Sequence, residues 1–150
     1  MRASKLLLWA CAVLLPFVAA QAPTSYQPIA SVAQIMLSMS YPMSDELLYV
    51  ERNPPKTDSD WNKLQYAAVV MGESGNLLMI QRLGTPRDQE GWIKDCKLLV
   101  DAGAAALKAA RAHDLPALLA LNGQIVDSCT TCHADYRPNY RRRPPLSPKP

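Results

Sequence analysis

The 150-residue chain lacks the sequence pattern of β-strands, since no segment alternates apolar and polar residues with a period of two. It also lacks an uncharged apolar run long enough for an ordinary membrane-spanning helix. The longest candidate, from Leu6 to Ala20, falls short of the roughly 17 residues usually needed and is interrupted by Pro16. These absences exclude a β fold and predict no stable insertion in a membrane.

The chain has little net charge. Without Arg2 and Lys5, which belong to a leader segment, it carries 14 basic and 13 acidic residues. Such a balance gives no strong field for nucleic acid, and we expect no nucleic-acid partner. Residues 137–150 nevertheless hold five bases and no acid. We interpret residues 139–150 as a disordered basic, proline-rich tail whose arginine run, 141–143, is solvated rather than docked on an acidic partner.

The first twenty residues resemble a leader rather than part of a fold. Arg2 and Lys5 precede an apolar core, and small residues close the segment at Ala20. This pattern is typical of a secretory signal peptide cleaved near Ala20, and it predicts export to the periplasm. A transmembrane anchor and a lipid anchor on Cys11 are the alternatives.

Cysteine is scarce outside the leader. Only Cys96, Cys129 and Cys132 remain after residue 20, and an odd number does not suit a scaffold of paired disulfides in an exported protein.

Between residues 21 and 138 the chain contains apolar residues spaced three and four positions apart, as on the buried face of a helix. Short links separate the four stripes, so the sequence predicts an all-α, antiparallel up-down-up-down four-helix bundle. The four stripes are Ile29, Val32, Met36, Met39, Met43, Leu47, Val50; Trp61, Leu64, Ala68, Met71, Gly75, Leu78; Trp92, Cys96, Leu99, Gly103, Ala106, Ala110; and Leu118, Asn122, Ile125, Cys129, Cys132, Tyr136.

Capping signals predict where three of these helices begin. Thr57 with Asp60 forms a capping box, and Asp114 is a suitable cap for the last helix. Thr85, followed by Pro86 and then by Asp88, predicts a further helix start. Pro42 should kink or divide the first helix, and the last should close before Pro138.

The motif that carries chemistry is Cys129-x-x-Cys132-His133, near the end of the last predicted helix. It is the attachment pattern of haem c, in which two thiols form thioethers with the porphyrin vinyl groups and the imidazole ligates iron. On a helix, the three residues lie within about one turn on one face. A redox dithiol, structural zinc and a plain disulfide are the alternatives, and we favour one covalent haem c because the chain has neither a βαβ pattern nor a second ligand pair.

With Tyr136 and Arg137, the motif reads Cys-x-x-Cys-His-x-x-Tyr-Arg, and this pattern at the end of a fourth helix resembles the class II cytochromes c, the cytochrome c-prime family. The resemblance implies a single haem inside the bundle near one end, with His133 on its proximal side. It implies a distal side that is either open or closed by a methionine of the first helix. It also implies a basic residue in the first helix near the propionates, yet no Lys or Arg lies between Lys5 and Arg52.

Bundle geometry narrows the choice of sixth ligand. The end of the fourth helix shares its level with the start of the first, the end of the second and the start of the third. This geometry places both Met36 and Met79 at the level of the haem. Since the resemblance implies a methionine of the first helix, Met36 is the first candidate, with Met39, Met79 and an open face as alternatives. His113 is excluded, because twenty helical residues place it about 30 Å from His133.

Further residues at the haem end are assigned more loosely. Arg82, Arg87 and Arg137 are candidates to face the propionates, against solvated surface charges as the alternative. Trp92 and Tyr136 are candidate walls of the haem environment. Cys96 is interpreted as a small buried hydrophobe rather than as a redox thiol.

These residues predict a non-enzymatic electron carrier whose iron cycles between Fe(III) and Fe(II). We expect it to exchange electrons with redox partner proteins. The alternative is an open-face haem protein that binds nitric oxide or carbon monoxide, and a third is a haem-free dithiol protein. The resemblance further implies pairing as a homodimer through the first two helices.

Overall fold

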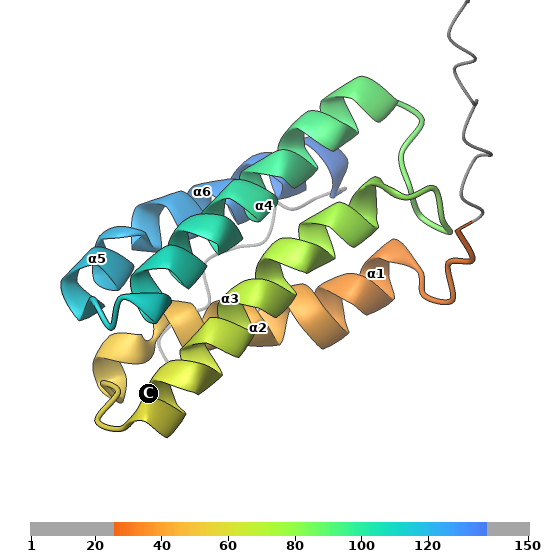
Figure 1. Ribbon diagram of the computed structural model, residues 1–150. Coiled ribbons are helices and arrows are strands. Elements are labelled where there is room, and N and C mark those ends of the chain that lie inside the picture. The colour runs from red at the N-terminus through yellow and green to blue at the C-terminus, as the bar shows by residue number, and fades with distance from the viewer. Residues whose placement is uncertain (1–25, 138–150) are drawn as a thin grey trace, which may run out of the picture.

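The computed structural model describes residues 26–137, and these residues form helices and no strand (Figure 1). The elements group into four helical segments, as in a helix bundle. The predicted signal peptide (residues 1–20) and the basic tail (residues 139–150) lie outside the described residues. The elements are α1 (Val32–Ile35), the π-helical turn η1 (Met36–Ser40), α2 (Tyr41–Leu48), the 3-10 turn η2 (Val50–Arg52), α3 (Asp58–Met79), α4 (Gln89–Arg111), α5 (Leu115–Ala120) and α6 (Asn122–Tyr136).

None of the helices between residues 26 and 137 combines the length and the hydrophobicity needed to cross a membrane.

The two long helices, α3 and α4, confirm their predicted stripes, since every residue of both stripes is buried. They run antiparallel, because Gly72 lies against Gly103 while the later Leu78 accepts a hydrogen bond at its carbonyl from the indole of the earlier Trp92 (2.7 Å). The close approach depends on glycine: a Cβ atom placed on Gly103 lies only 2.5 Å from the Cα of Gly72. The Thr57–Asp60 capping box at the start of α3 is confirmed.

The start of α4 differs from its prediction. The N-cap is Asp88, whose carboxylate accepts the backbone N–H of Gly91 at 3.1 Å, and the helix begins at Gln89. The hydroxyl of Thr85 instead accepts the backbone N–H of Arg82 at 3.0 Å. Thr85 was therefore the wrong cap, because its side chain is used within the turn that follows α3.

The first helical segment is divided, as Pro42 predicted. Ser31 forms an N-terminal capping box with Gln34, so the helix begins at Val32, and Ile29 is 99% exposed rather than part of the buried stripe. The π-helical turn η1 follows, with the backbone N–H of Tyr41 donating to the carbonyl of Met36. Pro42 lies just after this turn, where an α-helix would bring its ring against the carbonyl four residues earlier. A wider turn relieves that clash.

The last predicted helix begins at Asp114, whose carboxylate caps it as expected, but it is broken into α5 and α6 at Leu121. The Oδ1 atom of Asn122, at this break, is buried and has no hydrogen-bond partner among the described residues. The helix α6 ends at Tyr136, before Pro138, as predicted. Arg137 is extended, which suits a residue that precedes proline.

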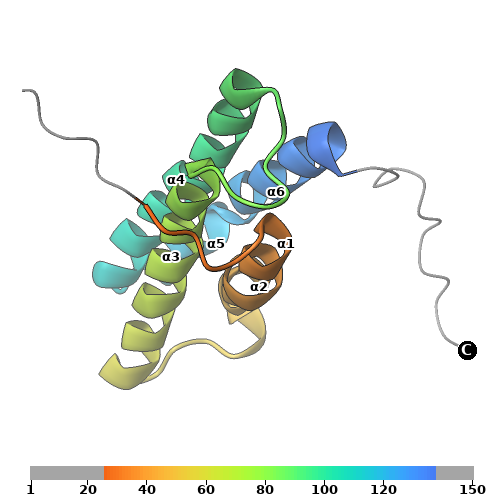
Figure 2. The same cartoon turned by 90° about the vertical axis from the view of Figure 1, so that its right-hand side faces the viewer.

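Four helix ends meet at one end of the molecule. The ring of Trp92, at the start of α4, contacts both Leu78 near the end of α3 and Tyr136 at the end of α6. The backbone N–H of Val32, at the start of α1, donates to the carbonyl of Leu83 just after α3 (3.0 Å). Figure 2 faces this end and shows the start of α1, the link between α3 and α4, and the last turns of α6 together. These four helix ends therefore lie together, as the sequence predicted.

His113 lies at the other end, after α4, in a left-handed conformation (φ 53°). Its N–H donates to the carbonyl of Ala110, and that of Asp114 donates to the carbonyl of Ala109, which is the hydrogen-bond pattern of a Schellman cap. The imidazole stacks on the indole of Trp61, with ring centroids 4.8 Å apart. The stack offsets part of the strain of a non-glycine residue in this conformation.

We expect His113→Ala to destabilise the fold by about 1 kcal/mol, because it removes the stack and keeps the left-handed strain. His113→Gly should lie closer to the parent protein, since glycine relieves that strain while losing the same stack. Urea denaturation of the three proteins measures the difference. Equal losses in the two variants would show that the backbone conformation contributes nothing.

Candidate haem-attachment site

The three motif residues lie on one turn of α6. Cys129 and His133 are half-buried, and Cys132 is 8% exposed and belongs to the hydrophobic core. Both thiols are free rather than joined in a disulfide. The spacing of three and four residues places them on a common helical face, so the arrangement that the sequence predicted is present.

Burial controls the acidity of the thiols. It raises the pKa of Cys132 to about 12, with further contributions from the carboxylates of Asp95 and Asp135, and it also raises the pKa of Cys129. Both thiols are therefore protonated near neutral pH. A protonated thiol is a poor nucleophile and a poor metal ligand, so a reactive dithiol is not what this environment favours.

The pKa of His133 shifts in the opposite direction. Burial, followed by the charge of Arg137, lowers the pKa of its imidazole. The neutral form is the one that binds a metal, because a ring nitrogen must be free of its proton to donate a lone pair. The environment of His133 thus favours the protonation state that iron ligation requires.

Asp95 is a residue that the sequence reasoning missed. The residue is 5% exposed, and the Oδ2 atom of its carboxyl group has no hydrogen-bond partner among the described residues. Burial and the nearby Asp135 raise the pKa of this carboxyl, while Lys94 opposes them. Asp95 also raises the pKa of Cys132, so an underpartnered acid adjoins the attachment turn. Its position next to Cys96 of a buried stripe could have singled it out from the sequence, because charged residues are rarely buried without a partner.

Trp92 and Tyr136 pack on each other beside the motif. Their rings meet edge to face at 5.2 Å, and the Tyr136 hydroxyl donates to Asp88 at 3.0 Å. Burial and this hydrogen bond raise the pKa of Tyr136 to about 12. A Cβ atom on Gly91 would lie 2.4 Å from the Tyr136 hydroxyl oxygen, so the contact needs glycine there. In the described residues these aromatic side chains fasten the end of α6 to the start of α4.

The guanidinium of Arg82 is engaged by backbone carbonyls. Nε donates to Ile80 (3.1 Å), Nη1 donates to Ala30 (3.2 Å), and Nη2 donates to Leu77. The side chain therefore closes the C-terminal end of α3 and joins it to the segment before α1. Arg87 and Arg137 are both exposed at the same end of the molecule.

Three candidate methionines lie near this end. Met36 begins η1, Met39 lies within it, and Met79 is the last residue of α3. Each is partly buried and packs against the core. Met71, in contrast, is fully buried in the middle of α3. The structure brings the predicted sixth-ligand candidates to the end that holds His133.

Cys96 lies across the α4 and α6 interface from the motif. It is 2% exposed, and burial, followed by the neighbouring Cys132, raises its pKa to about 12. A thiol in this state behaves as a small hydrophobic side chain, as the sequence predicted.

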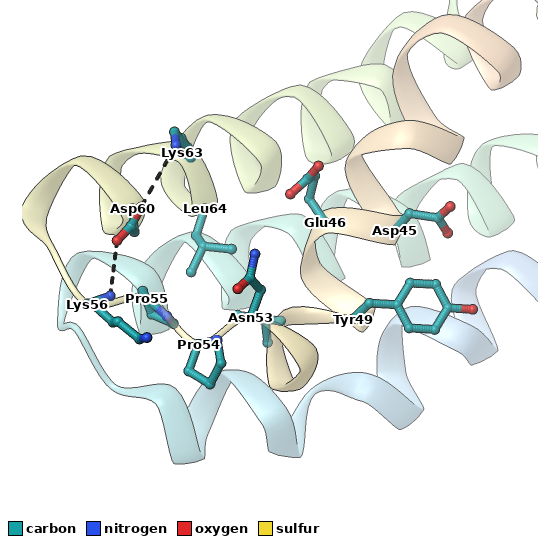
Figure 3. A pocket seen from close by; sticks show the side chains of 11 residues that line it. Asp45, Glu46, Tyr49, Asn53, Pro54, Pro55, Lys56, Asp60, Lys63 and Leu64 are labelled. Carbon is teal, nitrogen blue, oxygen red and sulfur yellow. Dashed lines mark hydrogen bonds and ion pairs between the residues drawn. The ribbon is translucent and has the colours of Figure 1, made fainter.

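A hollow lies at the end of the molecule opposite to the motif, between the end of α2 and the start of α3 (Figure 3). Charged groups of both signs line it, but Asp60 is engaged locally. Its carboxylate accepts the backbone N–H groups of Lys56 (3.1 Å) and Thr57 (3.0 Å) and lies 3.8 Å from the ammonium of Lys63. No residue of the cysteine and histidine motif borders this hollow.

No protein-family model, curated protein or solved structure matches the chain. Within residues 26–137, no three His, Cys, Asp or Glu side chains are grouped so as to hold a metal ion. The interpretation of the candidate site therefore rests on the chemistry of its own thiol and imidazole groups. Two free thiols and a neutral imidazole on one helical face fit a covalently attached haem c.

Proposed function

We propose that the protein is a monohaem c-type cytochrome that transfers electrons. The observation that carries this proposal is the single turn of α6 on which the free thiols of Cys129 and Cys132 stand beside His133. A half-buried thiol and a buried one, both protonated and with no disulfide between them, suit thioether formation better than a dithiol redox centre. Haem c, when bound, supplies a one-electron iron couple and needs no bond-making side chain from the protein.

Each side chain has a role in this proposal. Cys129 and Cys132 would anchor the cofactor, and His133 would ligate its iron through a ring nitrogen. Trp92 and Tyr136 keep the end of α6 on α4, so the anchoring turn has a fixed position. The partly buried Met36 would supply a thioether to the other side of the iron, which would favour the reduced state relative to an open or water-bound site.

The proposal includes the antiparallel up-down-up-down order of the four helical segments. The contacts of Trp92 with both Leu78 and Tyr136 support it, because a residue early in α4 meets residues late in α3 and in α6. It also includes export to the periplasm through residues 1–20, with electron exchange through redox partner proteins. The sequence of the leader supports that location.

Replacing Met36 with alanine tests the distal assignment. We expect the parent protein to be low-spin and not to take up carbon monoxide when reduced, because the thioether occupies the sixth position. Met36→Ala should be high-spin and bind carbon monoxide, with helix content unchanged, since Met36 is only partly buried. Visible spectra of both redox states, with and without the gas, measure this change.

Met79→Ala is the matched control, because Met79 is a second partly buried methionine at the same end. It should keep the parent spectrum. A high-spin parent protein that binds carbon monoxide freely would contradict electron transfer through a closed iron, and would support the gas-binding alternative.

A further inference from the structure

We propose that the π-helical turn Met36–Ser40, attached to the α3 side of the molecule through α1 before it and through Ser40 at its end, positions Met36 for the iron. The inference rests on the proposed function, because it concerns the distal ligand of that site. It assigns Ser40 and Ser74 as positioning residues, although neither has a side chain that ligates iron. Wide turns of this kind occur frequently at functional sites.

The start of α1, the helix that leads directly into the turn, is held by the link after α3. Val32 donates its backbone N–H to the carbonyl of Leu83 at 3.0 Å, and Arg82 donates from Nη1 to the carbonyl of Ala30 at 3.2 Å. Gly84 packs against Val32, where an added Cβ would lie 3.4 Å from the valine Cβ. These contacts fix where α1 begins relative to the end of α3.

The C-terminal end of the turn is held by a buried pair of hydroxyl groups. Ser40 Oγ lies 2.8 Å from Ser74 Oγ, and the two side chains are 6% and 0% exposed. Ser74 donates its single proton to the carbonyl of Met71 at 2.6 Å, so Ser40 must be the donor to Ser74. The hydroxyl of Ser74 in α3 thus fixes how the turn η1 is rotated about the axis of η1.

The turn between these two attachments contains one residue more than an α-helix would place there. The N–H of Tyr41 reaches back five residues to Met36 instead of four. Conversion to an α-helix would rotate one end against the other by about 100°, the angle that one residue occupies. Both attachments cannot survive that rotation, so the serine pair and the α1 attachment together keep Met36 in its present direction.

The experiment measures the carbon monoxide affinity of the reduced holoprotein in Ser40→Ala, Ser74→Ala and the double variant. Loss of one buried hydrogen bond corresponds to about a tenfold change in an equilibrium constant. We therefore expect the open form, and with it the apparent affinity for carbon monoxide, to increase about tenfold in each variant. The thioether-to-iron absorption band of the oxidised protein should weaken in parallel.

Ser44→Ala is the matched control. Ser44 is as buried as Ser40 (6%), but its hydroxyl donates to the carbonyl of Tyr41 within its own helical segment (2.8 Å). It should leave both readouts at the parent values, although it also removes a buried hydroxyl. The double variant should match the single ones, because all three lose the same hydrogen bond. Far-UV circular dichroism identifies any variant that fails to fold. If Ser74→Ala or the double variant does not fold, comparison of Ser40→Ala with the parent protein tests the inference alone.

The outcomes separate this inference from the proposed function. A parent protein with closed iron whose Ser40→Ala variant keeps the parent affinity and absorption band overturns the positioning role alone. An equal response in Ser44→Ala overturns it as well, because general loosening of the helix would then explain the effect. A parent protein with open iron overturns both the Met36 assignment and the positioning role.

Discussion

Cys129→Ala/Cys132→Ala should retain no haem after acid-acetone extraction, whereas the parent protein, produced in a host that attaches haem c, should keep its haem with the polypeptide. The reason is that these thiols are the proposed covalent anchors, and the imidazole of His133 alone binds haem reversibly. Haem-stained denaturing gels measure the retained fraction. We expect complete loss rather than a partial decrease, which makes this the largest effect predicted for the protein.

Cys96→Ala supplies the control for this experiment. Cys96 is as deeply buried as Cys132 and lies beside it across the helix interface, but it is outside the motif. The variant should retain haem at the parent level. Haem that persists on the double variant, or disappears from Cys96→Ala, would contradict attachment through Cys129 and Cys132.

Gly103→Ala should destabilise the fold by about 3 kcal/mol, at the upper end of the usual range for overpacked positions. Its Cβ would lie 2.5 Å from the Cα and 2.7 Å from the backbone nitrogen of Gly72, and 3.0 Å from the carbonyl oxygen of Ala68. All three atoms belong to the backbone of α3, which cannot move aside as a side chain can. The helices α3 and α4 must separate, and the free energy of unfolding from urea titration measures the result.

Two other glycines make this prediction specific. Gly72→Ala places its Cβ 3.4 Å from the Cα of Gly103, near ordinary van der Waals contact, and should be far milder. Gly123→Ala, in α6, meets no atom within 4 Å and should stabilise the protein by about 0.5 kcal/mol through helix propensity. An equal effect at Gly72 and Gly103 would show that the crossing is not as close as described.

The sequence was sufficient to predict the all-helical fold where residues are buried on one face. The stripes through Trp61 and Trp92 succeeded because hydrophobic periodicity and burial report the same physical fact. Capping at Thr57 and Asp114 succeeded because both side chains have only local partners. The order and identity of the helices therefore required no knowledge of tertiary contacts.

The errors arise where a local signal competes with a contact made elsewhere. Thr85 was predicted to cap α4, but its hydroxyl accepts the N–H of Arg82, and Asp88 caps the helix instead. Pro42 predicted an interruption of the first helix without predicting its form. That form is a π-helical turn whose last residue, Ser40, hydrogen-bonds to the distant Ser74, and no window of sequence around Pro42 contains that contact.

The candidate site was predictable to a similar degree. The motif itself fixed Cys129, Cys132 and His133, and helix order fixed the end of the molecule at which Met36 and Met79 lie. The carbonyl contacts of Arg82 and the buried carboxyl of Asp95 depend on how α3, α4 and α6 are set against one another. Identification of the sixth ligand stays a prediction, as do homodimer formation and the redox partners.

Peptide mass spectrometry of the protein matured in a host that attaches haem c tests the central claim most directly. The account predicts one haem per chain, carried covalently by the peptide that contains Cys129, Cys132 and His133. A polypeptide of haem-free mass from such a host, or haem carried by a peptide containing Cys96, would contradict it.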